Sequence, residues 1–143
     1  MSEVDAAPDG PVVSVSLGYR NLRALFIVGF VLEIILTFVP CHGADGRSFS
    51  DFESIRWAFQ QGRDGLAFLS VSMFCFAVAC AALAIAYPRR WVFIAGACFA
   101  AFNLILELFS GSNGNVYFLP QLLDYVATAM MITGFWIKPP ATC

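Results

Sequence analysis

Four apolar stretches, each close to the length needed to cross a bilayer, dominate this sequence. They run over about 22–39, 66–87, 91–109 and 116–137. A membrane-crossing helix needs about 20 consecutive apolar residues. Backbone N–H and C=O groups that lie in lipid must be satisfied within their own segment, and these stretches lack the alternation of a barrel strand, so each is predicted to be a helix. The sequence therefore predicts an all-α fold: a polytopic membrane protein built as an antiparallel four-transmembrane-helix bundle.

The composition agrees with a membrane protein rather than a water-soluble one. The 143 residues have a mean hydropathy of +0.76, and 13% of them are charged, whereas a soluble domain carries about 25% charged residues. The same apolar excess excludes a disordered chain. Eight Lys and Arg residues, spread along the chain, form no basic stripe, so nucleic acid is not an expected partner. We expect residues 1–18 to be a disordered polar tail and residues 19–143 to be a single transmembrane domain.

Positive charges indicate which side of the membrane each end faces. On one side of the predicted topology lie Arg20, Arg23, Arg89, Arg90 and Lys138, and on the other lie Arg47, Arg56 and Arg63. Since the cytoplasmic side carries the excess of positive charge, both termini are predicted to be cytoplasmic. The predicted location is a bacterial inner membrane or a eukaryotic equivalent.

The long loop after the first stretch carries a helix signal. Ser50 and Glu53 have the spacing of a capping box, in which each side chain bonds the other residue's backbone N–H. We therefore predict a short amphipathic helix over about 50–61, which lies on the outer membrane surface or caps the bundle. Its apolar face, a predicted interaction surface, consists of Phe52, Ile55 and Phe59. The alternative is an ordinary ordered loop.

Polar residues inside the predicted spans fall at a common depth. Ionisable groups within membrane spans usually face the bundle interior and have a role. At a rise of 1.5 Å per residue, these groups lie roughly 5 to 11 Å from the outer ends of their helices. We predict that they form one buried polar cluster: Glu33, Asn103, Glu107, Gln121 and Asp124, with Tyr117 and Tyr125 at its edge.

Two interpretations of this cluster stay open. It is either a site for a proton, a cation or the polar head of a lipid-like ligand, or a set of structural contacts between helices. Interhelical hydrogen bonds contribute about 0.6 kcal/mol each in membranes. Glu107 could also reach the interface by snorkelling, or pair with Arg56 or Arg63 from the outer loop.

No catalytic, metal or cofactor site is predicted. The chain contains neither a CxxC pair nor a catalytic signature. Its one histidine, His42, excludes a bis-histidine haem within one chain. The cysteines of the spans, Cys75, Cys80 and Cys98, are expected to pack as small apolar groups. Nothing in the sequence argues for an enzyme.

One short segment resembles a known family. Small multidrug resistance transporters are also short four-span chains with one acid in the first span, and the segment 31–35, Val-Leu-Glu-Ile-Ile, is similar to that pattern. The long loop 40–65, the Arg89-Arg90 turn and the further acids of the third and fourth stretches depart from the family. No residue roles are carried over.

Three functional hypotheses follow, and in each of them the protein is in contact with membrane lipids. The first is a protein that acts by binding, as an accessory, assembly or inhibitory partner of a larger membrane complex. The second is a small homo-oligomeric transporter or channel that uses the buried acids for protons or cations. The third is a pocket for a lipid or quinone beneath the outer loop. The expected protein partner is another membrane protein or a second copy of the chain.

Overall fold

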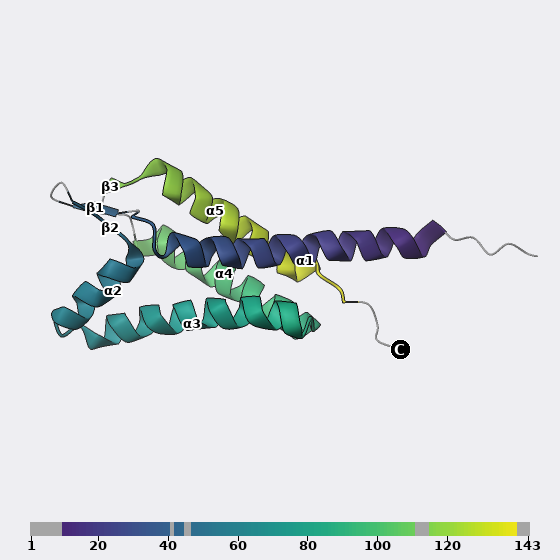
Figure 1. Ribbon diagram of the computed structural model, residues 1–143, viewed down its shortest axis with the longest axis horizontal. Helices are drawn as coiled ribbons and strands as arrows, with labels where there is room; N and C mark the ends of the chain where they lie inside the picture. The colour runs from purple at the N-terminus through teal and green to yellow at the C-terminus, as the bar shows by residue number, and fades with distance from the viewer. Residues whose placement is uncertain (1–9, 41, 45–46, 111–114, 140–143) are drawn as a thin grey trace, which may run out of the picture.

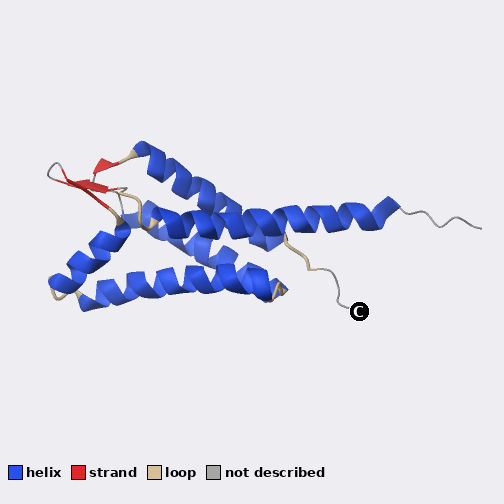
Figure 2. Ribbon diagram, viewed as in Figure 1, coloured by secondary structure: helices blue, strands red, loops and turns tan. Residues whose placement is uncertain are grey.

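The chain is helical, as predicted, with a small sheet at one end (Figures 1 and 2). The computed structural model describes residues 10–40, 42–44, 47–110 and 115–139. Over these residues the helices are α1 (Gly10–Leu36), α2 (Asp51–Gln60), α3 (Asp64–Ala86), α4 (Arg90–Ser110), α5 (Phe118–Ile132) and the 3-10 helix η1 (Thr133–Trp136). The strands are β1 (His42–Ala44), β2 (Arg47–Phe49) and β3 (Asn115–Val116).

Among the described helices, α3 and the Arg90–Leu108 part of α4 are long and apolar enough to cross a membrane. The charges of Arg20, Arg23 and Glu33 interrupt the apolar run of α1. The 15 residues of α5 extend about 22 Å, less than the hydrocarbon thickness of about 30 Å, before the chain continues as η1. By length and composition alone, α3 and α4 thus qualify as membrane-crossing helices. The other two predicted spans, in α1 and α5, do not.

The first helix begins earlier than the apolar pattern indicates. It starts at Gly10 and so extends into the segment 1–18 that we expected to be a disordered tail. Pro11 stands in the first turn, where its missing N–H removes no helical hydrogen bond. Extending an existing helix needs no new nucleus, which favours continuation from the apolar part of α1 towards the N-terminus. Residues 1–9 lie outside the described residues.

The four long helices pack in a ring, in which α1 and α4 each lie between α3 and α5. At the end where α3 turns into α4, the packing is tight, and Phe26, Phe30, Phe93 and Met131 are fully buried there. The Phe26 and Phe93 rings meet edge to face, with centroids 5.2 Å apart. This end of the bundle is closed.

An arginine fastens α1 to α3 at the closed end. The Nε and Nη2 atoms of Arg23 donate hydrogen bonds to the carbonyl oxygens of Ala84 (3.1 Å) and Ile85 (2.8 Å). These carbonyls belong to the last turn of α3, which has no helical donors left for them. A cation at a helix C-terminus is also favoured by the helix dipole.

At the opposite end, called the open end below, the long helices do not close on one another, and α2 lies across them. There α3 and α5 diverge, and α2 crosses from the end of α1 to the start of α3 (Figure 1). The predicted capping box is confirmed: Ser50 Oγ accepts from the Glu53 N–H (3.3 Å), and the Ser50 N–H donates to Glu53 Oε2 (2.9 Å). The Phe52 N–H donates to the Thr37 carbonyl (3.1 Å) and so ties α2 to α1.

The small sheet beside α2 was not expected from the sequence. Its strand order is β2-β1-β3 with antiparallel pairing throughout. His42 pairs with Phe49 on one side and with Val116 on the other. The sheet therefore joins the loop between α1 and α2 to the connection between α4 and α5. Because Val116 belongs to β3, the helix of the predicted fourth span begins at Phe118 instead of residue 116.

Candidate functional site

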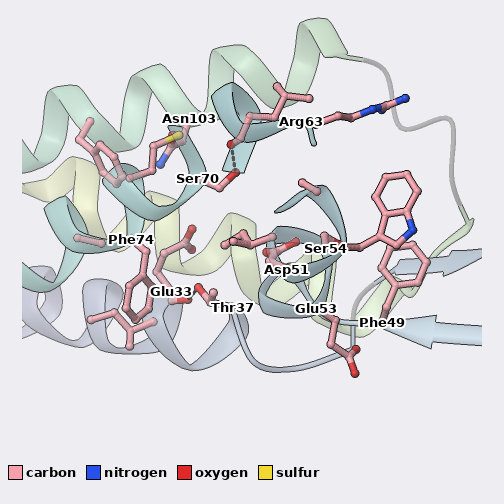
Figure 3. Close-up of a pocket in the computed structure, with 18 residues that line it drawn as sticks. Glu33, Thr37, Phe49, Asp51, Glu53, Ser54, Arg63, Ser70, Phe74 and Asn103 are labelled. Carbon is pink, nitrogen blue, oxygen red and sulfur yellow. Dashed lines mark hydrogen bonds between the residues drawn. The ribbon is translucent and has the colours of Figure 1, made fainter. Parts of the chain in front are cut away.

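A cavity of about 1180 Å³ occupies the open end, between α2 and the helices α1, α3 and α4 (Figure 3). Large apolar side chains form much of its wall, including Ile34, Trp57, Leu66, Met73, Phe74 and Phe99. Polar groups also face it, including Glu33, Thr37, Asp51, Arg63, Ser70 and Asn103. The cavity thus combines apolar walls with a small number of hydrogen-bonding groups, which is typical of a small-molecule site.

Two oxygens of this cavity lack partners. Oε2 of Glu33 and Oδ1 of Asn103 are buried, and neither has a hydrogen-bond partner within the described part of the chain. Glu33 comes from α1 and Asn103 from α4, and both line the cavity. Leaving a buried polar atom unsatisfied costs about 1 to 3 kcal/mol, and more if the atom is charged. A molecule that donates hydrogen bonds here would recover that cost.

A second cavity of about 250 Å³ adjoins the first, because Glu33, Thr37, Asp51 and Asn103 line both. Five of the residues that the sequence analysis assigned to the polar cluster surround it: Glu33, Asn103, Glu107, Gln121 and Asp124. The structure thus brings these side chains together from α1, α4 and α5.

Hydrogen bonds connect the three acids of this group. The Asp124 carboxyl group is hydrogen-bonded to both Glu33 and Glu107, and Glu107 also bonds the side chains of Gln121 and Tyr125. A carboxylate can only accept a hydrogen bond, so two carboxyl groups that bond each other need a proton between them.

The two tyrosines lie at the periphery. Tyr125 is partly exposed on α5, and its hydroxyl oxygen accepts from Gln121 Nε2 at 3.4 Å. Tyr117 is the N-cap residue of α5, is 48% exposed and lines neither of these two cavities. Tyr125 therefore reaches the acid group through hydrogen bonds, whereas Tyr117 does not border either cavity.

The apolar stripe of α2 faces the bundle. Ile55 lines the large cavity. The ring of Phe52 packs on Phe38, with centroids 5.4 Å apart, and the ring of Phe59 packs on Phe68 at 5.9 Å. In the structure α2 thus lies across the open end of the helices, as the capping alternative predicts, and its position relative to a membrane surface stays a prediction. Phe52 and Phe59 still expose about half of their surface.

Sequence reasoning missed most of the wall of the large cavity. Trp57, Phe74 and Phe99 come from three helices, and no spacing in the sequence indicates that they face one space. Thr37 is the exception, because it follows Glu33 by four residues and so lies on the same helical face. Within the described residues, no group of three or more His, Cys, Asp or Glu side chains is placed to hold a metal ion.

No known protein family, no characterised protein and no solved structure matches this chain. The chemistry of the two cavities is therefore the basis for a functional interpretation.

Proposed function

We propose that the protein is a four-span integral membrane protein that acts by binding. Exposed apolar surface supports the membrane location: only 22% of the most apolar part of α3 and 28% of that of α4 are buried. The core helix of a soluble protein would be mostly buried, and an apolar surface of this extent requires a cover. Lipid supplies that cover. Because α1 and α5 complete the same ring of helices, they cross the same layer.

We further propose that the ligand is an amphiphile held in the large cavity beneath α2. The observation that carries this proposal is the pair of unpartnered oxygens on Glu33 and Asn103, in a cavity with largely apolar walls. An apolar tail would contact Phe74 and Phe99, and a polar head would reach the two oxygens. The volume of about 1180 Å³ is large enough for a lipid-sized molecule.

The head group is expected to carry a hydroxyl. Glu33 Oε2 can be satisfied by a donor. The amide of Asn103 presents an oxygen acceptor and an NH₂ donor. A hydroxyl that donates its one hydrogen to Glu33 can accept from the Asn103 NH₂, and a second hydroxyl can donate to the Asn103 oxygen. A glycerol or quinol head has this chemistry, whereas an ester or ether head has only acceptors.

The proposal is tested by fluorescence of Trp57, which lines the cavity. Replacing the other two tryptophans, Trp91→Phe and Trp136→Phe, leaves Trp57 as the reporter. The protein is placed in nanodiscs of phosphatidylcholine, whose head group has no hydrogen-bond donor, and is titrated with 1-oleoylglycerol. Methyl oleate, with the same acyl chain but no donor, is the control ligand. We expect a saturable change with 1-oleoylglycerol and none with methyl oleate.

A variant identifies the groups that hold the head. Asn103→Leu should weaken binding of 1-oleoylglycerol about tenfold, the equivalent of about 1.4 kcal/mol. Asn21→Leu makes the same change at an exposed position of α1 and should bind like the parent protein. An equal response to both ligands, or an unchanged affinity in Asn103→Leu, would contradict the proposal.

A second candidate function is the transport of protons or cations, and the hydrogen-bonded acids Glu33, Asp124 and Glu107 favour it. It requires pH-dependent flux in liposomes that falls in Glu33→Gln and Asp124→Asn, and unchanged flux in both variants would exclude this mechanism. The role of accessory partner in a larger complex stays a prediction. Copurification of a second membrane protein would support it.

A further inference from the structure

Positive charge gathers at the closed end of the bundle. Arg23 is used within the protein, because its guanidinium group binds the last carbonyls of α3. The segments that meet here are the start of the bundled part of α1, the connection from α3 to α4, and the residues that follow η1. Four further cations at this end have exposed side chains: Arg20, Arg89, Arg90 and Lys138.

The contact of Arg23 places two of these cations at one level. Its Nε atom donates to the Ala84 carbonyl oxygen at 3.1 Å, near the C-terminus of α3. Arg20 lies one turn earlier on α1 and so just beyond this contact. Arg89 stands in the connection that follows α3, and therefore lies beyond the same contact.

The last cation, Lys138, is brought to the same end by η1. Gly134 of η1 lies so close to α4 that a Cβ atom on it would come within 2.5 Å of the Phe93 carbonyl oxygen. From this contact, Arg90 lies one turn back along α4, and Lys138 lies further along the chain after η1. Because α4 starts and η1 ends at the closed end (Figure 1), both cations lie on the outer side of the contact.

These charges are not balanced by acids among the described residues. The first acid along α1 after Arg23 is Glu33, about 15 Å farther on at 1.5 Å per residue. For exposed charges this separation exceeds the Debye length of about 8 Å at physiological ionic strength. The other described acids lie on α2, at the start of α3, or on the parts of α4 and α5 nearer the open end. Within the described part of the chain, the positive charge of the closed end is therefore uncompensated.

Aromatic side chains mark the level of the lipid head groups at this end. Tyr87, Trp91 and Trp136 each expose more than half of their surface. They belong to the end of α3, the first turn of α4 and the end of η1. Exposed tyrosine and tryptophan are enriched where a membrane meets water. The four exposed cations therefore lie beside these aromatic side chains, at the level of the phosphates.

We propose that the closed end binds the head groups of anionic phospholipids, whose phosphates are held by the four exposed cations. Guanidinium groups suit this partner, because their fork of N–H donors matches the oxygens of a phosphate. A zwitterionic phospholipid carries a compensating ammonium group, so the excess of positive charge favours lipids with a net negative charge. The inference goes beyond the ligand of the large cavity and rests only on the membrane location proposed above.

Quenching of Trp91 measures which lipids lie at this end. Replacing Trp57→Phe and Trp136→Phe leaves Trp91, which directly follows Arg90, as the reporter. The protein is reconstituted in phosphatidylcholine vesicles in which a fixed fraction of the lipid has brominated chains and quenches tryptophan on contact. That fraction is phosphatidic acid or, as the matched lipid, phosphatidylcholine. Phosphatidic acid has a phosphate and no further head group, so its effect is separate from the hydroxyl chemistry proposed for the large cavity.

We expect brominated phosphatidic acid to bind about fivefold more strongly at Trp91 than brominated phosphatidylcholine, the ratio that one contact between a basic side chain and an anionic lipid supplies. This preference should disappear in about 1 M salt, where the Debye length is about 3 Å. Quenching by brominated phosphatidylcholine should persist there, because it reports contact with lipid chains and not charge.

Three variants locate the preference. Arg90→Gln should at least halve the ratio, and Arg89→Gln combined with Arg90→Gln should bring it close to one. Both side chains are exposed, so these changes leave the packed core intact. Arg56→Gln makes the same change at an exposed position of α2, at the open end, and should keep the ratio of the parent protein.

The outcomes separate this inference from the membrane location. Equal quenching by the two brominated lipids, or an unchanged ratio in the combined variant, overturns the inference and leaves the membrane location standing. A ratio lowered as much by Arg56→Gln as by Arg90→Gln also overturns it, because the preference would then reflect the total charge of the protein. Absence of quenching by either lipid overturns the membrane location itself.

Discussion

The ring of Phe26 lies directly against Gly96, so that a Cβ atom at position 96 would come within 2.5 Å of the Phe26 Cζ atom. The ring of Phe30 approaches the same position to 2.9 Å. Through these two rings α1 contacts α4 across the middle of the ring of helices, at the closed end of the bundle. The large cavity lies at the opposite end, where α3 and α5 diverge (Figure 1). The helices are thus tightly packed at one end and leave a ligand-sized cavity at the other.

Gly96→Ala should destabilise the protein by about 1 to 3 kcal/mol, because the added methyl group overpacks a rigid aromatic contact. Gly65→Ala is the matched control. A Cβ at Gly65 meets nothing within 4 Å, and replacing glycine in a helix stabilises it by about 0.5 to 1 kcal/mol. Unfolding in mixed micelles with increasing SDS measures both. Equal stability of the two variants would show that α1 and α4 do not pack as described.

Arg23→Leu should separate α1 from the end of α3. The change removes two hydrogen bonds from a charged group to the carbonyls of Ala84 and Ile85, each of which is worth about 1.5 to 3 kcal/mol. Arg20→Leu, at an exposed position one turn earlier, should have a small effect. The same SDS titration compares them. If Arg20→Leu proves as destabilising as Arg23→Leu, the arginine contact is not what joins these helices.

Ser50→Ala should loosen α2. Loss of the N-cap hydroxyl costs about 1 kcal/mol, and α2 has only 10 residues. Amide hydrogen exchange at Glu53 and Ser54 should therefore become faster. Ser72→Ala is the control, because the Ser72 hydroxyl bonds a carbonyl within α3 and caps no helix. Unchanged exchange in Ser50→Ala would mean that α2 is held by its aromatic contacts alone.

Labelling tests the four-span topology. In a chain whose native cysteines are replaced by serine, Gln61→Cys lies in the turn before α3 and Arg89→Cys in the turn after it, and both positions are exposed. If α3 crosses the membrane and both termini are cytoplasmic, a membrane-impermeant maleimide added to intact bacteria should label Gln61→Cys only. Labelling of Arg89→Cys alone would reverse the orientation, and labelling of both would exclude a crossing by α3.

Helix positions and the cluster of polar side chains could be predicted because each depends on a regular repeat. The length of an apolar stretch indicates α3 and α4 within two residues. The 1.5 Å rise placed Glu33, Asn103 and Asp124 at one depth, and the structure has all three around one cavity. Whether that group is a functional site remains a prediction.

The sheet and the large cavity could not be predicted in this way. The strands have two or three residues each, too few for an alternating pattern. The Asp45-Gly46 pair between β1 and β2 is a hairpin signal, but the pairing of β1 with β3 depends on the packing of the helices. The cavity lies between α2 and the helices α1, α3 and α4, and which side chains face it depends on how these helices pack against one another.

The central claim is that the cavity beneath α2 holds an amphiphile with a hydroxyl-bearing head. Native mass spectrometry of the protein extracted from the host membrane in mild detergent tests it most directly. The account predicts an added mass of one small amphiphile, identified by fragmentation as carrying a hydroxyl, that is retained by Asn21→Leu and lost by Asn103→Leu. A protein that carries no such mass, or the same bound mass in both variants, would contradict it.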